Sequence, residues 1–136
     1  MYKVTKDQWF KKSAKQDTKN TMAISEFEIK RTESELEKYL AKNRPPAHLR
    51  HQVDIGYRIS GQSVELFEIR PHWKAVDSKI ETPVAKATFV KTKGHWKVFW
   101  MQQGLKWHRY DSNPEVSRIE DFLQIVSEDE HSCFFG

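Results

Sequence analysis

Apolar and polar residues alternate near the middle of the chain, and this alternation predicts a β-hairpin. The apolar positions of its first strand are Val53, Ile55, Tyr57 and Ile59. A period of two is typical of a strand with one buried face. Residues 60–62 supply a turn, and a two-residue loop there places Ile55 and Tyr57 on the same face as Val64 and Leu66.

A second hairpin is predicted after a long polar connection from Pro71 to Pro83. With Lys93-Gly94 as its loop, Phe89 lies opposite Val98 and Ala87 lies opposite Trp100. The reverse face of this hairpin is then basic and aromatic. Its residues are Lys86, Thr88, Val90, Lys97, Phe99 and Met101. A turn at Gln103-Gly104 and renewed alternation over 105–110 predict a fifth strand.

Two helices are predicted, one before the strands and one after them. Ser25 and Glu28 match a capping box at the start of a helix over 26–42, which Pro45-Pro46 cannot continue. Ser112 and Glu115 form a second capping box, and apolar residues then recur at helical spacing, which predicts a helix over 114–127.

These elements predict an α+β fold, with a five-stranded, mainly antiparallel meander and both helices packed on one sheet face. The predicted core face carries Ile55, Tyr57, Leu66, Phe89, Val98 and Trp100. We expect a single domain over 22–136, preceded by a flexible basic extension over 1–21 with six Lys and two Asp. The aromatic pair Phe134 and Phe135 is expected to pack back onto the domain, because exposing both rings to water is unfavourable.

Composition indicates a folded cytoplasmic protein. Aromatic residues make up 12% of the chain, more than a disordered chain would carry. The single cysteine, Cys133, excludes an internal disulfide and favours a reducing compartment. The chain contains no apolar stretch long enough to cross a bilayer, so we expect no membrane partner.

The positive charge is concentrated in one part of the chain. Between Thr82 and Tyr110 there are six Lys or Arg, two His and no carboxylate. Such a segment favours an anionic partner, and lysines interleaved with aromatic residues are typical of nucleic-acid binding. The predicted binding residues are Lys86, Lys91, Lys93, Trp96, Lys97, Phe99, Lys106, Trp107, His108 and Arg109, together with His72, Trp73 and Lys74 in the loop before the second hairpin.

An alternative is a protein-interaction module or a homodimer that uses the same sheet face. If both helices cover one face only, apolar residues on the other face remain exposed. The predicted patch consists of Phe67, Val90, Phe99 and Met101.

A divalent-metal nuclease is a third hypothesis, with Asp54, Glu68 and Arg70 as its candidate catalytic residues. That chemistry needs two carboxylates around one metal ion. In the predicted register Glu68 points to the face opposite Asp54, which argues against it. The structural interpretation is that Asp54 is solvated and that Glu68 pairs with a nearby Arg or Lys.

No metal or cofactor is predicted. The six histidines are His48, His51, His72, His95, His108 and His131. None has the compact spacing of a zinc motif. Cys133 lies two residues from His131, but neighbouring Asp129 and Glu130 are expected to raise its pKa, which opposes a nucleophilic role.

Six segments resemble a bacterial family of small proteins known as the domain-of-unknown-function 3024 family. They are Ile24-Ser25-Glu26-Phe27-Glu28, Gly56-Tyr57-Arg58-Ile59, Val64 to Trp73, Val84-Ala85-Lys86-Ala87-Thr88, Leu105-Lys106-Trp107-His108 and Cys133-Phe134-Phe135-Gly136. The resemblance spans the chain apart from its first twenty-one residues. It implies a bacterial source, and it brings no established activity or catalytic residue.

Overall fold

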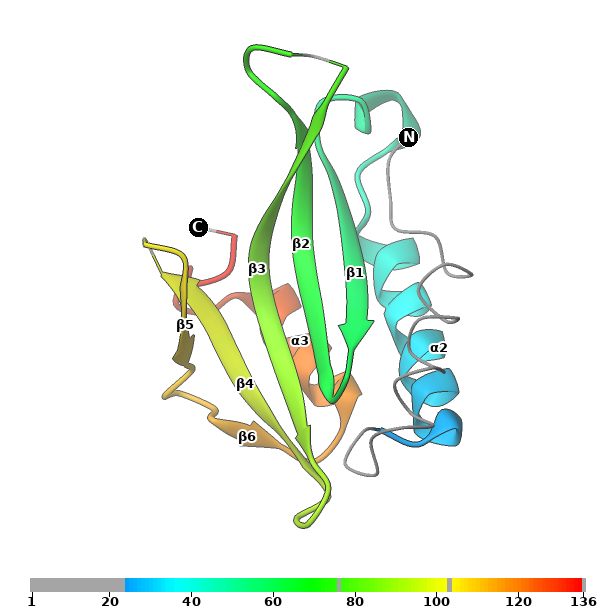
Figure 1. The fold of residues 1–136 in the computed structure, drawn as a ribbon, viewed down its shortest axis with the longest axis vertical. Helices are drawn as coiled ribbons and strands as arrows, with labels where there is room; N and C mark the ends of the chain where they lie inside the picture. The colour runs from blue at the N-terminus through cyan, green and yellow to red at the C-terminus, as the bar shows by residue number, and fades with distance from the viewer. Residues whose placement is uncertain (1–23, 76, 103, 136) are drawn as a thin grey trace.

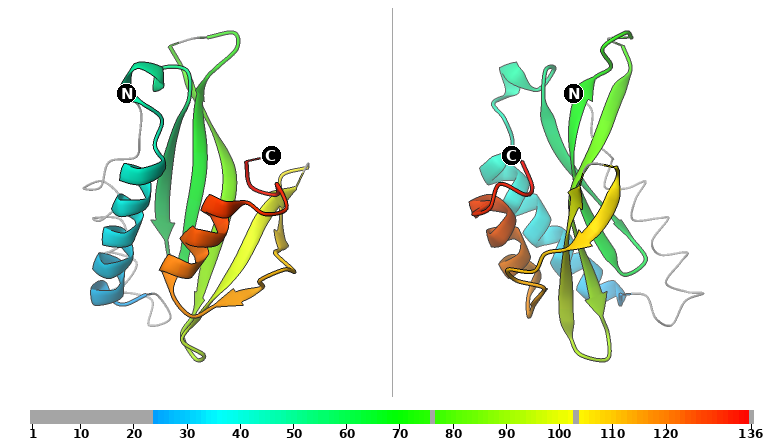
Figure 2. Two further views of the ribbon diagram at one scale, coloured as in Figure 1. Left: turned by 180° about the vertical axis from the view of Figure 1, so that it is seen from behind. Right: turned by 90° about the vertical axis from the view of Figure 1, so that its left-hand side faces the viewer.

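The computed structural model describes residues 24–75, 77–102 and 104–135. In chain order the elements are α2 (Glu26–Asn43), the 3-10 helix η1 (Ala47–Leu49), β1 (Asp54–Ser60), β2 (Ser63–Pro71), β3 (Lys79–Val90), β4 (His95–Gln102), β5 (Lys106–Arg109), β6 (Glu115–Val116) and α3 (Ile119–Glu128). The strands form one antiparallel sheet in the order β1-β2-β3-β4-β5 (Figure 1), and β6 pairs with β4. Both helices lie on the same side of that sheet (Figure 2). The predicted α+β meander is confirmed, and the predicted extension over 1–21 lies outside the described residues.

The first helix begins where its capping residue predicts. The Ser25 side chain accepts a hydrogen bond from the Glu28 amide at 3.3 Å. This bond satisfies one of the amides that have no partner inside the helix. The helix ends at Asn43, one residue beyond the predicted end, just before Pro45-Pro46.

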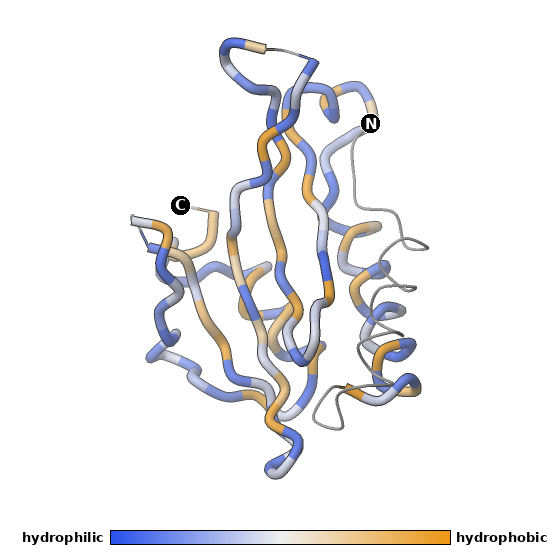
Figure 3. Tube along the Cα trace, viewed as in Figure 1, coloured by the Kyte–Doolittle hydropathy of each residue, from blue (hydrophilic) through white to orange (hydrophobic). Residues whose placement is uncertain are grey.

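The first hairpin has the predicted two-residue loop and the predicted faces. Ser60 pairs with Ser63 across a two-residue loop, which sets Tyr57 opposite Leu66 and Ile59 opposite Val64. Gly61 in that loop has a φ of +60°, a conformation that glycine adopts without strain. The alternation of apolar and polar residues along these strands is visible in Figure 3.

The predicted long connection from Pro71 to Pro83 is wrong, because both flanking strands extend into it. β2 continues to Pro71 and β3 begins at Lys79, so the connecting loop covers only 72–78. Pro83 lies inside β3, where the register with β2 shifts between Leu66 and Phe67. Proline has no amide hydrogen to donate, and such an irregularity is one of the places where a sheet accepts it.

The second hairpin has the predicted faces but different partners. Ala87 pairs with Val98, and Phe89 pairs with Trp96, across a four-residue loop over 91–94. The predicted pairs were two residues away from these. A shift of two preserves the side on which each residue lies, so the predicted assignment of faces holds.

The second helix starts five residues later than predicted. Glu115 and Val116 form β6 rather than a first helical turn, and α3 begins at Ile119. β5 pairs with β4 only from Phe99 to Gln102, which leaves the earlier part of the β4 edge for β6. The backbone N–H and C=O groups on this part of the β4 edge would have no partner without β6. Their pairing with residues 115–116 favours a strand there over the helix start that the capping box at Ser112 predicts, because unpaired backbone groups are costly where they are buried.

The core lies between the helices and the sheet face that carries Ile55, Tyr57, Leu66 and Val98, as predicted. Phe89 and Trp100 pack against it. The C-terminal tail returns to this core through Phe134, whose ring lies 5.0 Å from that of Tyr110. Asp129 fixes the tail, since its carboxylate accepts hydrogen bonds from the amides of Phe134 and Phe135 at 3.0 and 2.9 Å.

A buried ion pair joins the end of α2 to the start of β1. Asp54 is 1% exposed and accepts two hydrogen bonds from the Arg44 guanidinium, at 2.8 and 2.7 Å. Its carboxylate also accepts the Ile55 amide at 2.8 Å. The prediction that Asp54 is solvated is therefore wrong, because a planar guanidinium from the end of the helix replaces its water.

Asp54→Ala is expected to destabilise the fold by about 3–5 kcal/mol, because it leaves the Arg44 guanidinium, whose side chain is only 12% exposed, without a counterion. The control is Asp111→Ala, which removes the solvent-exposed pair with Arg109 and should cost less than about 1 kcal/mol. Urea unfolding followed by circular dichroism measures both. Equal losses in the two variants would contradict a structural role for the buried pair.

Candidate functional site

The sheet face turned away from the helices carries a compact group of basic and aromatic side chains. We define the outer face by Lys86, Lys97, Phe99, Met101, Trp107 and Arg109 on β3, β4 and β5. Phe99 lies opposite Lys86 on one side and Arg109 on the other. The Lys86 ammonium is 5.0 Å from the ring centres of both Phe99 and Trp107. This is cation–π geometry, so Lys86 joins the two rings into one continuous surface.

Carboxylates from other segments approach the cations of the outer face. Glu65 on β2 lies opposite Lys86, and Glu115 on β6 lies opposite Lys97. Asp111 accepts a hydrogen bond from Arg109 at 2.9 Å. The segment without carboxylates in the sequence is therefore not free of them in space, and the positive potential of the outer face is reduced.

Three predicted binding residues lie on the helix-covered side instead. Trp96 is 2% exposed and belongs to the core, so it is not available to stack on a ligand. His108 lies opposite Trp100, with their rings 6.1 Å apart, and Lys106 shares that side because side chains alternate along β5. Lys91 and Lys93 lie in the loop between β3 and β4.

The loop with His72, Trp73 and Lys74 lies at the other end of the sheet from the β3–β4 loop (Figure 1). His72 accepts hydrogen bonds through Nδ1 from the amides of Lys74 and Ala75, at 3.1 and 3.3 Å. Trp73 is 77% exposed, and the Lys74 ammonium lies 4.5 Å from its ring centre. This loop is therefore a separate candidate contact point, because the length of β3 separates it from the β3–β4 loop.

The candidate nuclease residues do not converge. Asp54 pairs with Ile69 in the sheet, whereas Glu68 pairs with Ile55 and so projects from the opposite face. Arg70 donates a hydrogen bond to Glu68 at 3.4 Å, as predicted for a nearby cation. Within the described ranges no three His, Cys, Asp or Glu side chains form a group suited to a metal ion.

The family model for a domain of unknown function, DUF3024, matches residues 24–136. The chain belongs to the DUF3024 family. No curated protein and no solved structure is significantly similar to it. Of the helices that the structure describes, none is both long and apolar enough to cross a membrane.

Phe67 of this DUF3024 domain is not part of an exposed apolar patch, contrary to prediction. Its side chain is 2% exposed. The Arg58 guanidinium lies 4.7 Å above its ring and pairs with Glu81, while Gly56 lies against the ring from the neighbouring strand. A Cβ at Gly56 would approach the Phe67 ring to 2.9 Å, so glycine is needed for this packing.

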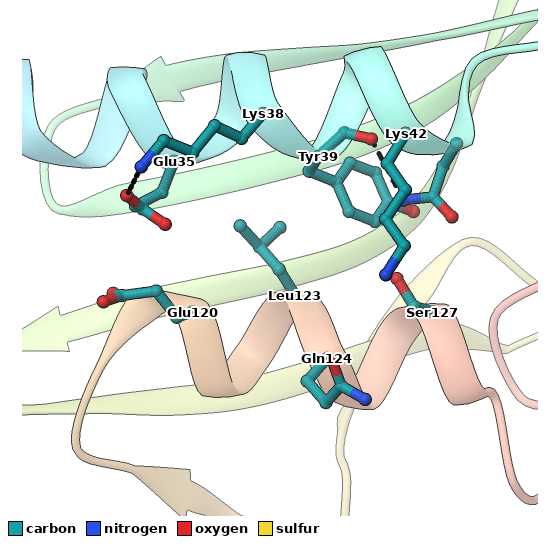
Figure 4. A pocket seen from close by; sticks show the side chains of 9 residues that line it. Glu35, Lys38, Tyr39, Lys42, Glu120, Leu123, Gln124 and Ser127 are labelled. Atoms are coloured by element: carbon teal, nitrogen blue, oxygen red, sulfur yellow. Dashed lines mark hydrogen bonds and ion pairs between the residues drawn. The ribbon is translucent and has the colours of Figure 1, made fainter.

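A groove between the two helices was not predicted from the sequence. It is lined by charged and polar side chains of α2 and α3 around Leu123 (Figure 4). Lys38 pairs with Glu35 at 3.0 Å within this groove. Sequence reasoning could not find it, because the helices are separated by the entire sheet in chain order.

Cys133 is half-buried, and its thiol lies 3.7 Å from the His131 carbonyl oxygen. Burial raises its pKa, and the Asp129 carboxylate raises it further. The rise in the Cys133 pKa agrees with the prediction. A raised pKa leaves less thiolate at neutral pH and makes Cys133 a poor nucleophile.

Iodoacetamide should alkylate folded Cys133 more slowly than the same chain unfolded in guanidinium. The ratio of the two rates should be constant below the ordinary thiol pKa and should fall as the pH rises through the higher pKa of the folded form. The reason is that folding keeps the thiol protonated to higher pH. Mass spectrometry of timed samples measures the rate, and the single cysteine makes its assignment direct. Faster alkylation of the folded form at neutral pH would indicate an activated thiolate.

Proposed function

We propose that this DUF3024 domain is a non-catalytic protein that binds nucleic acid through its outer face, with a preference for unpaired bases. The observation that carries the proposal is the position of Lys86 between Phe99 and Trp107, with Arg109 beside them. Ammonium and guanidinium groups contact phosphates, and aromatic rings stack on bases of any sequence.

The geometry supports contact with a single strand. Lys97 and Arg109 are exposed, whereas the rings of Phe99 and Trp107 are half-buried and present their remaining surface next to these cations. A phosphate drawn to a cation therefore brings the adjoining base close to a ring. In duplex nucleic acid the bases are stacked on each other, and the rings would be left without a partner.

The carboxylates next to the outer face lower the affinity that we expect for nucleic acid. Glu65, Glu115 and Asp111 compete with phosphates for Lys86, Lys97 and Arg109. We therefore expect weak binding that is readily lost in salt. Three phosphate contacts on a single strand predict that log K falls with log salt with a slope of about −2.

The test is fluorescence-anisotropy titration of a labelled oligothymidylate and a matched duplex at several salt concentrations. Arg109→Ala should reduce the salt slope by about 0.7, because one phosphate contact is lost. Trp107→Ala should weaken binding by about 1–3 kcal/mol through loss of one stacked base.

The matched control is Lys106→Ala. Lys106 is an exposed cation on the same strand as Arg109, and it projects from the opposite side of the sheet. Its removal should leave affinity and slope unchanged. Absence of binding at low salt, or equal losses in the Lys106 and Arg109 variants, would refute the proposal. Equal affinity for the single strand and the duplex would show that the rings do not stack on unpaired bases.

A second candidate function is interaction with another copy of the domain through the outer face. It is favoured by the mixture of half-buried Val90, Phe99 and Met101 with cations that each have a carboxylate neighbour. An apolar centre with charges of both signs around it is typical of protein interfaces.

In this alternative, sedimentation velocity should show a species of twice the 16.2 kDa chain mass at high protein concentration. Phe99→Glu should shift the equilibrium to the monomer, because it introduces a charge at the centre of the contact. Lys106→Glu on the opposite side is the control. A monomer at every concentration would exclude this function.

A further inference from the structure

We propose that a hollow between the C-terminal ends of α2 and α3 binds a small organic ammonium ion. The hollow has a volume of about 260 Å³ and lies between both helices, the inner sheet face and the C-terminal tail. It is separate from the outer face, because its strand residues project from the opposite side of the sheet. The residues that carry the inference are Glu68, Tyr39, Phe135, Ile55 and Val126.

The electrostatics of the hollow favour a cation. Glu68 lines it from β2. Asn43, the last residue of α2, and Ser127, next to the last residue of α3, also line it, so both helices end there. The C-terminal end of a helix carries partial negative charge and stabilises cations. The last turn of α3 contains no basic residue that would neutralise this effect, whereas Lys42 lies in the last turn of α2 and lines the neighbouring groove, so α3 supplies the larger part of it.

The cation that already touches Glu68 leaves room for a ligand. Arg70 donates to the Glu68 carboxylate at 3.4 Å, and its side chain is largely exposed to solvent. A hydrogen bond of this length is weak, and exposed ion pairs contribute little free energy. An ammonium ion entering the hollow can therefore replace Arg70 or share the carboxylate with it.

The walls favour an organic cation over a metal ion. Tyr39 and Phe135 provide aromatic rings, which attract ammonium groups through cation–π contacts. Burial, and after it the Asp129 carboxylate, raise the pKa of Tyr39 to about 12, so its hydroxyl stays protonated at moderately alkaline pH as well as at neutral pH. Ile55 and Val126 add apolar surface for a short hydrocarbon body.

The tail holds one of these rings in place. Asp129 binds the amides of Phe134 and Phe135, and the Phe134 ring is anchored in the core. Phe135 is left 42% exposed at the edge of the hollow. Its ring is thus positioned by the backbone while one side stays available for a ligand.

The probe is 2-phenylethylammonium, added to isotopically labelled protein in a nuclear magnetic resonance titration. We expect saturable shifts at the methyl groups of Ile55 and Val126. The neutral analogue 2-phenylethanol and the anion 3-phenylpropionate, which have similar shapes, should bind at least about tenfold more weakly, because they cannot form the charge-assisted bond to Glu68.

Glu68→Gln should weaken binding of the ammonium probe by about tenfold or more. The matched control is Glu65→Gln on the same strand, which alters the outer side of the sheet and should have no effect. Phe135→Ala, at a partly exposed position, provides a second variant whose fold is checked by its methyl spectrum, and it should also weaken binding.

Absence of saturable shifts with the ammonium probe at millimolar concentration would refute the site. Equal binding of the alcohol and the ammonium ion would show an apolar cavity without the proposed charge recognition. Retention of full affinity in Glu68→Gln would have the same consequence.

Discussion

The alternation of side chains across a single sheet determines what lies on each of its two faces. The two-residue loop at Gly61-Gln62 sets Tyr57 opposite Leu66, and all other positions of the hairpin follow from that pairing. A slip of one residue would turn the apolar side chains of one strand to solvent and bring either Arg58 of β1 or Glu65 of β2 into the core. Burial of the apolar set makes such a slip very unfavourable, so the outer face and the hollow are defined by the same constraint.

This constraint explains which parts of the fold could be predicted. The period of two keeps Ala87 and Val98 on the core face when the pairing shifts by two residues, so the faces were predicted although the partners were two residues away. The sequence has no comparable pattern from which the length of the β3–β4 loop could be predicted. Pro83 was interpreted as a boundary, whereas it lies at a register shift inside β3, a position that only pairing with β2 reveals.

At the candidate site, the sequence predicted neighbours on adjacent strands but not contacts between distant segments. Local spacing identified Lys86 and Phe99 as residues of one face and Arg109 as a binding residue of the strand that follows, because β3, β4 and β5 follow one another in the chain. It could not show that Glu115 would return through β6 to lie beside Lys97, nor that Arg44 would enclose Asp54. Both contacts depend on tertiary packing of segments whose local patterns indicated something else.

β2 connects the two proposed sites through its own alternation. Glu65 lies beside Lys86 on the outer side, whereas Glu68, three residues later, lines the hollow on the inner side. A strand cannot rotate one of these side chains to the other face without breaking its hydrogen bonds to both neighbours. Occupation of the hollow therefore has no simple mechanical route to the outer face through β2. Any thermodynamic coupling between the two sites would have to pass through the electrostatic field of Glu68 and Arg70, and it would weaken as salt screens these charges.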